Sequence, residues 1–371
     1  MKLRPPAFPL ITVDPYFSVW SHSDELYASD TVHWTDDPNP IRGTVTVDGE
    51  TFRFMGQSAD AEIKQIFSDL SALVTDYVFE NEKIVLHLSF YSTLFPDDLY
   101  RLSRPISYLK INYESNDGKE HKVSVNVSAT EELCINKAGE TPVLAQSVEL
   151  GDGSFAEKIG SVYQKMLGRS GDVLRIEWGY FYLCGPNGSE YKSFEEDGKT
   201  VISASFPLEE GVCSDLLFAY DDIKCLNYFG TNVDAYWKTK GLSMEQALVE
   251  AKNESGEMLE KCRKISEELF DDAENAGGEK YAELLELSYR QLIAAHKLAV
   301  DTEGQIIFIS KECLSNGCAA TVDVTYPSAP FFMLYSPELL KGMLRPIFKY
   351  AESDDWKYDF APHDIGTYPL L

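Results

Sequence analysis

The feature that most constrains the fold is a change of hydrophobic periodicity near Asp234. Before it, short segments alternate apolar and polar residues, which is typical of half-buried strands. After it, apolar residues recur at helical spacing, starting behind the capping-box sequence Ser243-Met-Glu-Gln246. We therefore predict an antiparallel β-sandwich followed by antiparallel helices. The expected parts are an N-terminal extended and hairpin segment packed on the sandwich (1–70), the sandwich (71–233) and a helical domain (234–371).

The strand predictions follow from alternation and from polar turns. Residues 44–54 form a predicted hairpin around the tight turn Asp48-Gly49. The segment before it is rich in proline and aromatic residues and resembles an interrupted edge strand. Further strands are predicted at 73–79, 84–91, 107–113, 122–128, 173–184, 200–206 and 212–220.

Three helices are predicted, at 243–270, 279–300 and 337–353, with the break at Gly277-Gly278 and a strand at 305–309 between the last two. The second helix has a wide apolar face, which we expect to be its buried inner side: Tyr281, Leu284, Leu285, Ser288, Tyr289, Leu292 and Ala295. His296, near the end of that helix, is expected in the core. Because the first two helices have too few partners, we predict that they bury these faces by self-association or against a separately encoded remainder.

The net charge and the cysteine pattern limit which ligands and which cellular compartment are expected for the protein. A net charge of −27 argues against binding nucleic acid or an anionic membrane through a basic face. The sequence has no apolar signal segment and no stretch long enough to span a membrane. Seven cysteines without metal-binding spacing suggest reduced core thiols in a cytoplasmic protein. With no glycine-rich phosphate loop either, we expect no metal and no cofactor, and a small-molecule substrate.

Two polar clusters, 310–326 and 358–368, flank the third helix and supply the candidate catalytic residues Asp323, His363 and Asp364. Two carboxylates in different surroundings can divide into a general acid and a general base, and a histidine beside one of them can assist. The candidate substrate-binding residues in the same clusters are Lys311, Asn316, Tyr326 and Tyr368.

Other interpretations of these clusters stay open. Each aspartate can serve only to structure its loop, and His363 can be an ordinary hydrogen-bonded loop histidine. Cys313 or Cys318 can be a nucleophile with His363 as its base, although no nucleophile motif surrounds either thiol.

Seven stretches spread over the whole chain resemble the glutaminase A-like proteins of fungi and bacteria: 4–20, 31–34, 52–56, 310–317, 321–327, 337–342 and 363–369. The resemblance implies an N-terminal β-sandwich followed by an (α/α)6 toroid similar to that of six-hairpin glycosidases. It also implies hydrolysis of L-glutamine to glutamate and ammonia. Members of that family continue past the equivalent of Leu371. The resemblance therefore implies a C-terminally truncated chain with the opening part of the toroid and little or no activity alone.

The leading functional hypothesis is a glutaminase-type hydrolase. One of Asp323 and Asp364 would activate water, and the other, with His363, would protonate the leaving ammonia. A six-hairpin glycoside hydrolase in carbohydrate metabolism is the alternative, because the carboxylate pair suits it equally and Trp34, Trp356 and Tyr368 are able to stack on sugars. A non-catalytic fragment or binding module is the third.

Overall fold

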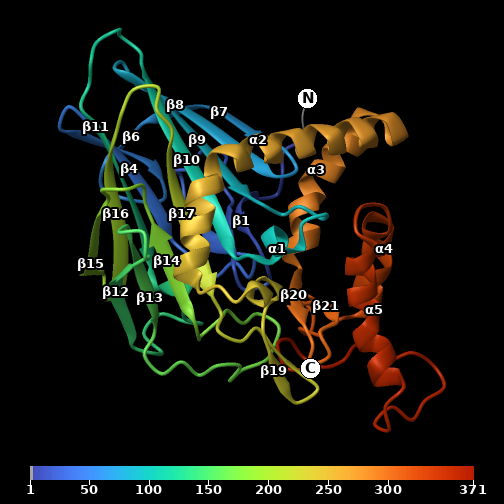
Figure 1. Cartoon of the computed structure of the whole chain (residues 1–371). Helices are drawn as coiled ribbons and strands as arrows, with labels where there is room; N and C mark the ends of the chain where they lie inside the picture. Colours follow the sequence, from blue (N-terminus) through green and yellow to red (C-terminus); the bar gives the residue numbers. More distant parts are fainter. Residues whose placement is uncertain (1–2) are drawn as a thin grey trace.

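The computed structural model describes residues 3–371, and two large β-sheets dominate its N-terminal part (Figure 1). The larger sheet has eight strands in the order β12 (Val143–Glu149), β13 (Phe155–Ser161), β14 (Tyr180–Cys184), β17 (Ser214–Asp221), β10 (Ile106–Ser115), β9 (Ile84–Ser92), β8 (Val74–Glu80) and β7 (Lys64–Leu70). The smaller sheet has six, in the order β15 (Glu190–Glu196), β16 (Lys199–Leu208), β11 (Val123–Thr130), β4 (Ile41–Val47), β5 (Glu50–Met55) and β6 (Ala61–Glu62).

Alternation of side chains explains why these segments form a sandwich. β4 and β11 bury every second residue, and their buried valines join one continuous core with β9 and β10. The β-sandwich prediction is confirmed. One detail differs: β4 and β5 are strands of the six-stranded sheet rather than a hairpin packed on the sandwich, because β4 pairs along its whole length with β11. The predicted strand 173–184 begins only at Tyr180.

Several strands were not predicted from the sequence. These are β7 and the hairpins β12–β13 and β18 (Leu226–Tyr228)–β19 (Thr231–Val233), the edge strands β6 and β15, and β3 (Val32–His33). The predicted interrupted edge strand is present as β1 (Phe8–Thr12) and β2 (Ser18–Ser21), which pair with each other and form a small sheet with β3. Short helical segments also occur: α1 (Leu99–Ser103), η1 (Glu131–Leu133) and η2 (Tyr236–Lys240).

Helix α2 (Met244–Gly277) covers the outer face of the eight-stranded sheet (Figure 1). Its start is the predicted capping box, in which Ser243 and Gln246 bond each other's backbone N–H groups. Polar contacts tie it to the sheet: the Tyr91 hydroxyl donates to the Ser255 carbonyl at 3.1 Å, and the Leu73 N–H donates to the Ser266 hydroxyl at 3.1 Å. The strands β8, β9, β10 and β17 at the centre of the sheet are thus covered on both faces.

The remaining helical part differs from the prediction in two places. Helix α3 (Glu279–Ala294) ends before residue 300, and His296, which is buried as expected, opens the hairpin β20 (His296–Val300)–β21 (Ile306–Ser310). The end of the polar cluster 310–326, with Asp323 and Tyr326, is helical rather than a loop, because it begins helix α4 (Val322–Tyr335), which was not predicted. Its hairpin partner, α5 (Pro337–Ala351), packs against β21 and matches the predicted helix.

Helix α3 turns a different face inward from the one predicted. Its buried side includes Glu283, Glu286 and Arg290, whereas Tyr281 is 50% and Leu284 55% exposed. All seven residues of the predicted inner face line an apolar groove of about 950 Å³ between α3 and α4, and Tyr289 among them is buried as predicted. Self-association through such a face stays a prediction.

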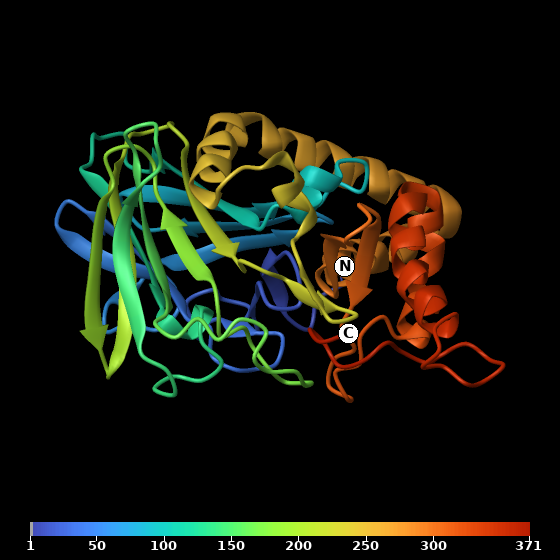
Figure 2. The same ribbon diagram turned by 60° about the horizontal axis from the view of Figure 1, so that its bottom comes forward.

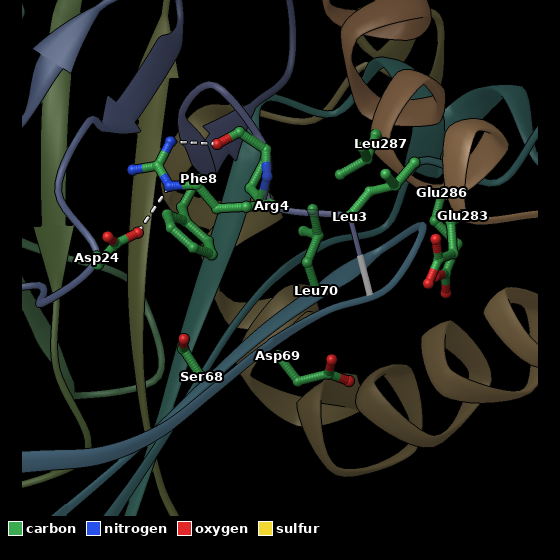
Figure 3. Close-up of a pocket in the computed structure, with 11 residues that line it drawn as sticks. Leu3, Arg4, Phe8, Asp24, Ser68, Asp69, Leu70, Glu283, Glu286 and Leu287 are labelled. Carbon is green, nitrogen blue, oxygen red and sulfur yellow. Dashed lines mark hydrogen bonds and ion pairs between the residues drawn. The ribbon is translucent and has the colours of Figure 1, made fainter. Parts of the chain in front are cut away.

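A smaller cavity of about 280 Å³ lies where the N-terminal segment, β7 and α3 meet (Figure 3). Arg4 lines it and forms a 2.7 Å ion pair with Asp24, and the carboxylates of Asp69, Glu283 and Glu286 lie on its other side. None of the candidate site residues lines this cavity. Among residues 3–371 no helix is long and apolar enough to cross a membrane.

Candidate functional site

The candidate site is held by two backbone segments that pair with each other at one end of the α4–α5 hairpin. In Figure 2 these segments lie below the two red helices. Residues 317–322 exchange backbone hydrogen bonds with residues 363–368: Ile365 N–H donates to Ala319 O at 3.1 Å, and Val322 N–H donates to His363 O at 3.0 Å. Because these bonds cross between two sequence-distant segments, they fix the relative positions of the side chains on both.

The imidazole of His363 lies between the two candidate carboxylates. Its Nδ1 is 2.9 Å from Oδ2 of Asp364, and its Nε2 is 3.3 Å from Oδ1 of Asp323. The prediction that the two aspartates lie at the same end of the helical layer is confirmed. Asp323 stands in the first turn of α4 and is largely exposed, whereas Asp364 is half-buried.

The surroundings shift the pKa values of His363 and Asp364 in opposite directions. The hydrogen bond to Asp364 raises the pKa of His363, and the negative charge of Asp323 adds to this effect. Burial alone would raise the pKa of Asp364, but hydrogen bonds from His363 and from the Gly366 N–H outweigh it and lower that pKa. The pair therefore favours an imidazolium beside a carboxylate.

A thiol and a further carboxylate adjoin this group. Ligand atoms of Cys318, His363 and Asp364 all lie within 4.8 Å of one another. Burial, together with the charge of Asp364, raises the pKa of Cys318 to about 11. That value argues against a thiolate nucleophile at neutral pH. Glu312 approaches from β21's end and accepts a 3.2 Å hydrogen bond from Thr321.

The four predicted binding residues do not gather around His363. Asn316 is exposed, and its Oδ1 accepts the Cys318 N–H at 2.8 Å. Tyr326 points into solvent from α4 and is 84% exposed. Lys311 is buried, bonds the Asp172 carbonyl and lies over the Trp34 ring. Tyr368 is buried with its ring 5.2 Å from that of Tyr16.

A sandwich loop supports the site, and nothing in the sequence pointed to it. Asp172 lies in the irregular stretch between β13 and β14 and accepts the Leu314 N–H at 2.8 Å. Beside it, Gly171 touches Gly317 so closely that a Cβ on Gly317 would lie 2.6 Å from the Gly171 carbonyl carbon. An aspartate in a long loop carries no periodic signal, so only the folded contact reveals it.

Not all the cysteines are core thiols as expected. All seven are free, but Cys213 and Cys313 are exposed and Cys318 is half-buried, whereas the other four are buried.

Comparison with solved structures shows the class of fold. A protein assigned as a kojibiose phosphorylase from the human microbiome aligns with a TM-score of 0.52 at 12% identity, covering 93% of this chain and 46% of that one. The family GH92 inverting mannosidase of Bacteroides thetaiotaomicron aligns with a TM-score of 0.50 at 11% identity, covering 97% and 46%. The fold is an antiparallel β-sandwich followed by the opening part of an (α/α)6 toroid.

Sequence comparison then gives the family. The glutaminase A six helical-hairpin domain matches residues 278–371, and two domains of unknown function match residues 1–68 and 74–215. Glutaminase A of Aspergillus oryzae is 27% identical over 98% of the chain, and a probable glutaminase of Arthroderma benhamiae is 23% identical over 99%. The domain match and the two glutaminase-named relatives support a glutaminase A-like family, as the sequence indicated. It spans 59% and 49% of the lengths of these two relatives.

Proposed function

We propose that the protein, a hydrolase-like member of its family, hydrolyses the side-chain amide of L-glutamine, and that Asp323 and His363 are the catalytic residues. The observation that carries this proposal is the single imidazole placed between two carboxylates. The names of the two curated relatives support glutamine as the substrate.

In the proposed reaction Asp323 is the general base. Its exposed carboxylate takes a proton from a water molecule, whose oxygen attacks the amide carbon of glutamine. The carbon–nitrogen bond then breaks as His363 gives the Nε2 proton to the leaving nitrogen, which departs as ammonia. Because Nε2 lies 3.3 Å from Asp323, the proton taken from water can return to the imidazole and restore both groups.

Asp364 has a positioning role in this scheme. It accepts a hydrogen bond from the Nδ1–H of His363, so it orients the ring and favours its cationic form, as a carboxylate does for a catalytic histidine elsewhere. Asn316 and Tyr326 keep exposed side chains and are proposed to contact the substrate. Lys311 and Tyr368 are buried, and we assign them to the support of the site loops. The cytoplasmic location stays part of this proposal.

The test measures ammonia and glutamate released from L-glutamine by the full chain. Asp323→Asn is expected to lower the rate by about 10²- to 10⁴-fold, the usual contribution of a general base. Asp359→Asn is the matched control, because Asp359 is an exposed acid a few residues before His363 and outside the cluster. A rate in Asp323→Asn equal to that of the control would overturn the assignment.

The fold similarity to the mannosidase and the phosphorylase favours a second candidate, glycoside hydrolysis. In that case Asp323 would act on a water beside the sugar and His363 or Asp364 would protonate the leaving oxygen. Incubation with an oligosaccharide panel distinguishes the two reactions. A chain that binds but cleaves neither substrate would support the binding-module alternative.

A further inference from the structure

We propose that Cys318, His363 and Asp364 form a binding site for a divalent transition-metal ion of the zinc type, and that the bound ion switches off the hydrolysis. Only the inhibition rests on the proposed function, since binding of the metal is tested separately.

The geometry brings three different ligand types to one point. Their ligand atoms lie within 4.8 Å of one another, and the ligands of a tetrahedral zinc ion lie roughly 3.3 to 3.8 Å apart. Small side-chain rotations therefore complete the site. The backbone bridge between Cys318 and Thr367 joins the two ligand-bearing segments, and the Gly366 N–H holds Asp364 in place.

The charge around the site independently favours a cation. Glu312, Asp323 and Asp364 gather around one histidine, and their charges all act on the Cys318 thiol. Within residues 3–371 no lysine or arginine forms an ion pair with any of these three carboxylates, because Lys311 points instead to Asp172. A divalent ion would compensate this excess negative charge and stabilise the thiolate.

The ligand set selects the kind of ion. Calcium and magnesium prefer oxygen ligands alone, whereas a thiolate, an imidazole and a carboxylate together suit zinc and leave a position open. On binding, the Cys318 thiol and Nδ1 of His363 each release a proton to solvent. Nε2 keeps its proton and lies 3.3 Å from Asp323. A carboxylate is a usual hydrogen-bond acceptor for the second ring nitrogen of a metal-bound histidine.

Occupation of the site removes the proposed acid. A histidine that binds metal through Nδ1 is neutral, so it no longer delivers the proton that the leaving nitrogen needs. Asp364 is also withdrawn from orienting the ring. Zinc binding therefore prevents the proton transfer from His363 on which the proposed reaction depends.

The first experiment titrates the metal-free full chain with Co²⁺ and records the near-ultraviolet absorption that only a thiolate–cobalt bond produces. We expect one ion per chain, displaced by Zn²⁺. Cys318→Ser should abolish the absorption, and Cys313→Ser, which alters an exposed thiol outside the cluster, should retain it. His363→Gln is a second ligand variant that should weaken binding at least about tenfold. The proposal would be overturned if no ion binds, if the absorption survives Cys318→Ser, or if Ca²⁺ binds more tightly than Zn²⁺.

The second experiment measures ammonia release with added Zn²⁺. Inhibition should be reversed by a chelator, and Cys318→Ser should keep the metal-free rate while requiring at least about tenfold more Zn²⁺ for inhibition. Equal zinc sensitivity of Cys318→Ser and the native chain would overturn the inhibition. If the native chain releases no ammonia, the proposed function fails, and the cobalt absorption still decides whether the metal site exists.

Discussion

The Nε2 atom of His363 lies 3.3 Å from Oδ1 of Asp323, although the whole α4–α5 hairpin separates the two residues in the sequence. The hairpin creates this contact, because the start of α4 and the segment after α5 return to the same end. Asp323 also stands in the first turn of α4, where the helix dipole favours a negative charge. The contact therefore joins a carboxylate at the start of a helix to an imidazole whose pKa is raised by Asp364.

The pKa of His363 provides a direct check of this arrangement in metal-free protein. Its hydrogen bond to Asp364 is the largest cause of the raised pKa, and the charge of Asp323 is a smaller one. Asp364→Asn should therefore lower the His363 pKa more than Asp323→Asn does. An NMR titration of the ring protons measures both shifts, and a larger shift in Asp323→Asn would contradict the geometry.

Since His363 acts as an acid, activity should fall as pH rises through its pKa, and Asp364→Asn should move that fall to lower pH.

The sequence predicted the sandwich strands well because their burial alternates, as in β4 and β11. It missed α4 because Pro327 and Pro330 lie inside that helix, where proline normally argues against helix. Its inward face for α3 was only partly right, because Tyr289 is buried whereas Tyr281 and Leu284 are exposed. Periodicity locates apolar residues but does not show that Arg290 has partners on strands more than two hundred residues away.

For the site, too, local sequence patterns identified candidate residues but not their long-range contacts. Asp323, His363 and Asp364 were predictable because polar residues cluster around one helix, and the fold brings all three together. Lys311 and Tyr368 belong to the same clusters but point into the interior. The orientation of a side chain in an irregular segment depends on contacts with distant parts of the chain, such as the loop around Asp172, and no local pattern encodes them.

Gly317 tests the contact between the sandwich loop and the site. Its φ is +72°, and a Cβ there would lie 2.6 Å from backbone of Gly171. Gly317→Ala should therefore cost about 1–3 kcal/mol and loosen the neighbouring pairing. Hydrogen exchange of the Tyr368 N–H, which bonds the Gly317 carbonyl at 2.9 Å, should become faster.

Gly304→Ala is the control for that substitution. Gly304 has a similar φ of +79°, but no atom lies within 4 Å of the added Cβ. It therefore reports only the cost of the left-handed conformation. Equal effects of the two substitutions on stability and on Tyr368 exchange would show that the approach of Gly171 is unimportant.

Arg290 tests how α3 is attached to the sandwich. The guanidinium is buried and donates to the carbonyls of Pro9, Ser71 and Val74 and to the Thr75 hydroxyl, at 2.8–3.2 Å. Arg290→Met should lower the free energy of unfolding by about 3–5 kcal/mol, because these buried acceptors lose their donor. Arg263→Met, which removes a half-exposed ion pair to Asp76, should cost at most about 1 kcal/mol. Urea unfolding measures both, and similar losses would contradict the special role of Arg290.

Lys297 tests a buried ion triad that joins three parts of the chain. Its ammonium group lies 2.6 Å from Oδ2 of Asp14 and 2.7 Å from Oδ2 of Asp222, and all three side chains are buried. Lys297→Met leaves two buried carboxylates without their cation. At pH 7 it should lower the free energy of unfolding by about 3–5 kcal/mol. Lys224→Met, which removes a partly exposed ion pair to Asp234, should cost at most about 1 kcal/mol.

The pH dependence should separate Lys297→Met from the native chain. In the native chain burial alone would raise the pKa of Asp14, but Lys297 outweighs it and lowers that pKa. This carboxylate therefore stabilises the fold above its unfolded pKa, and the stability is lost as pH falls through the folded value. Burial already raises the pKa of Asp222 in the native chain in spite of Lys297. Without Lys297 the folded pKa values of both aspartates rise, so their protonation on acidification offsets part of the loss of stability. Urea unfolding at pH 7 and pH 5 should therefore show a smaller deficit at pH 5, and a constant or larger deficit would mean that the aspartates are not the groups that Lys297 neutralises.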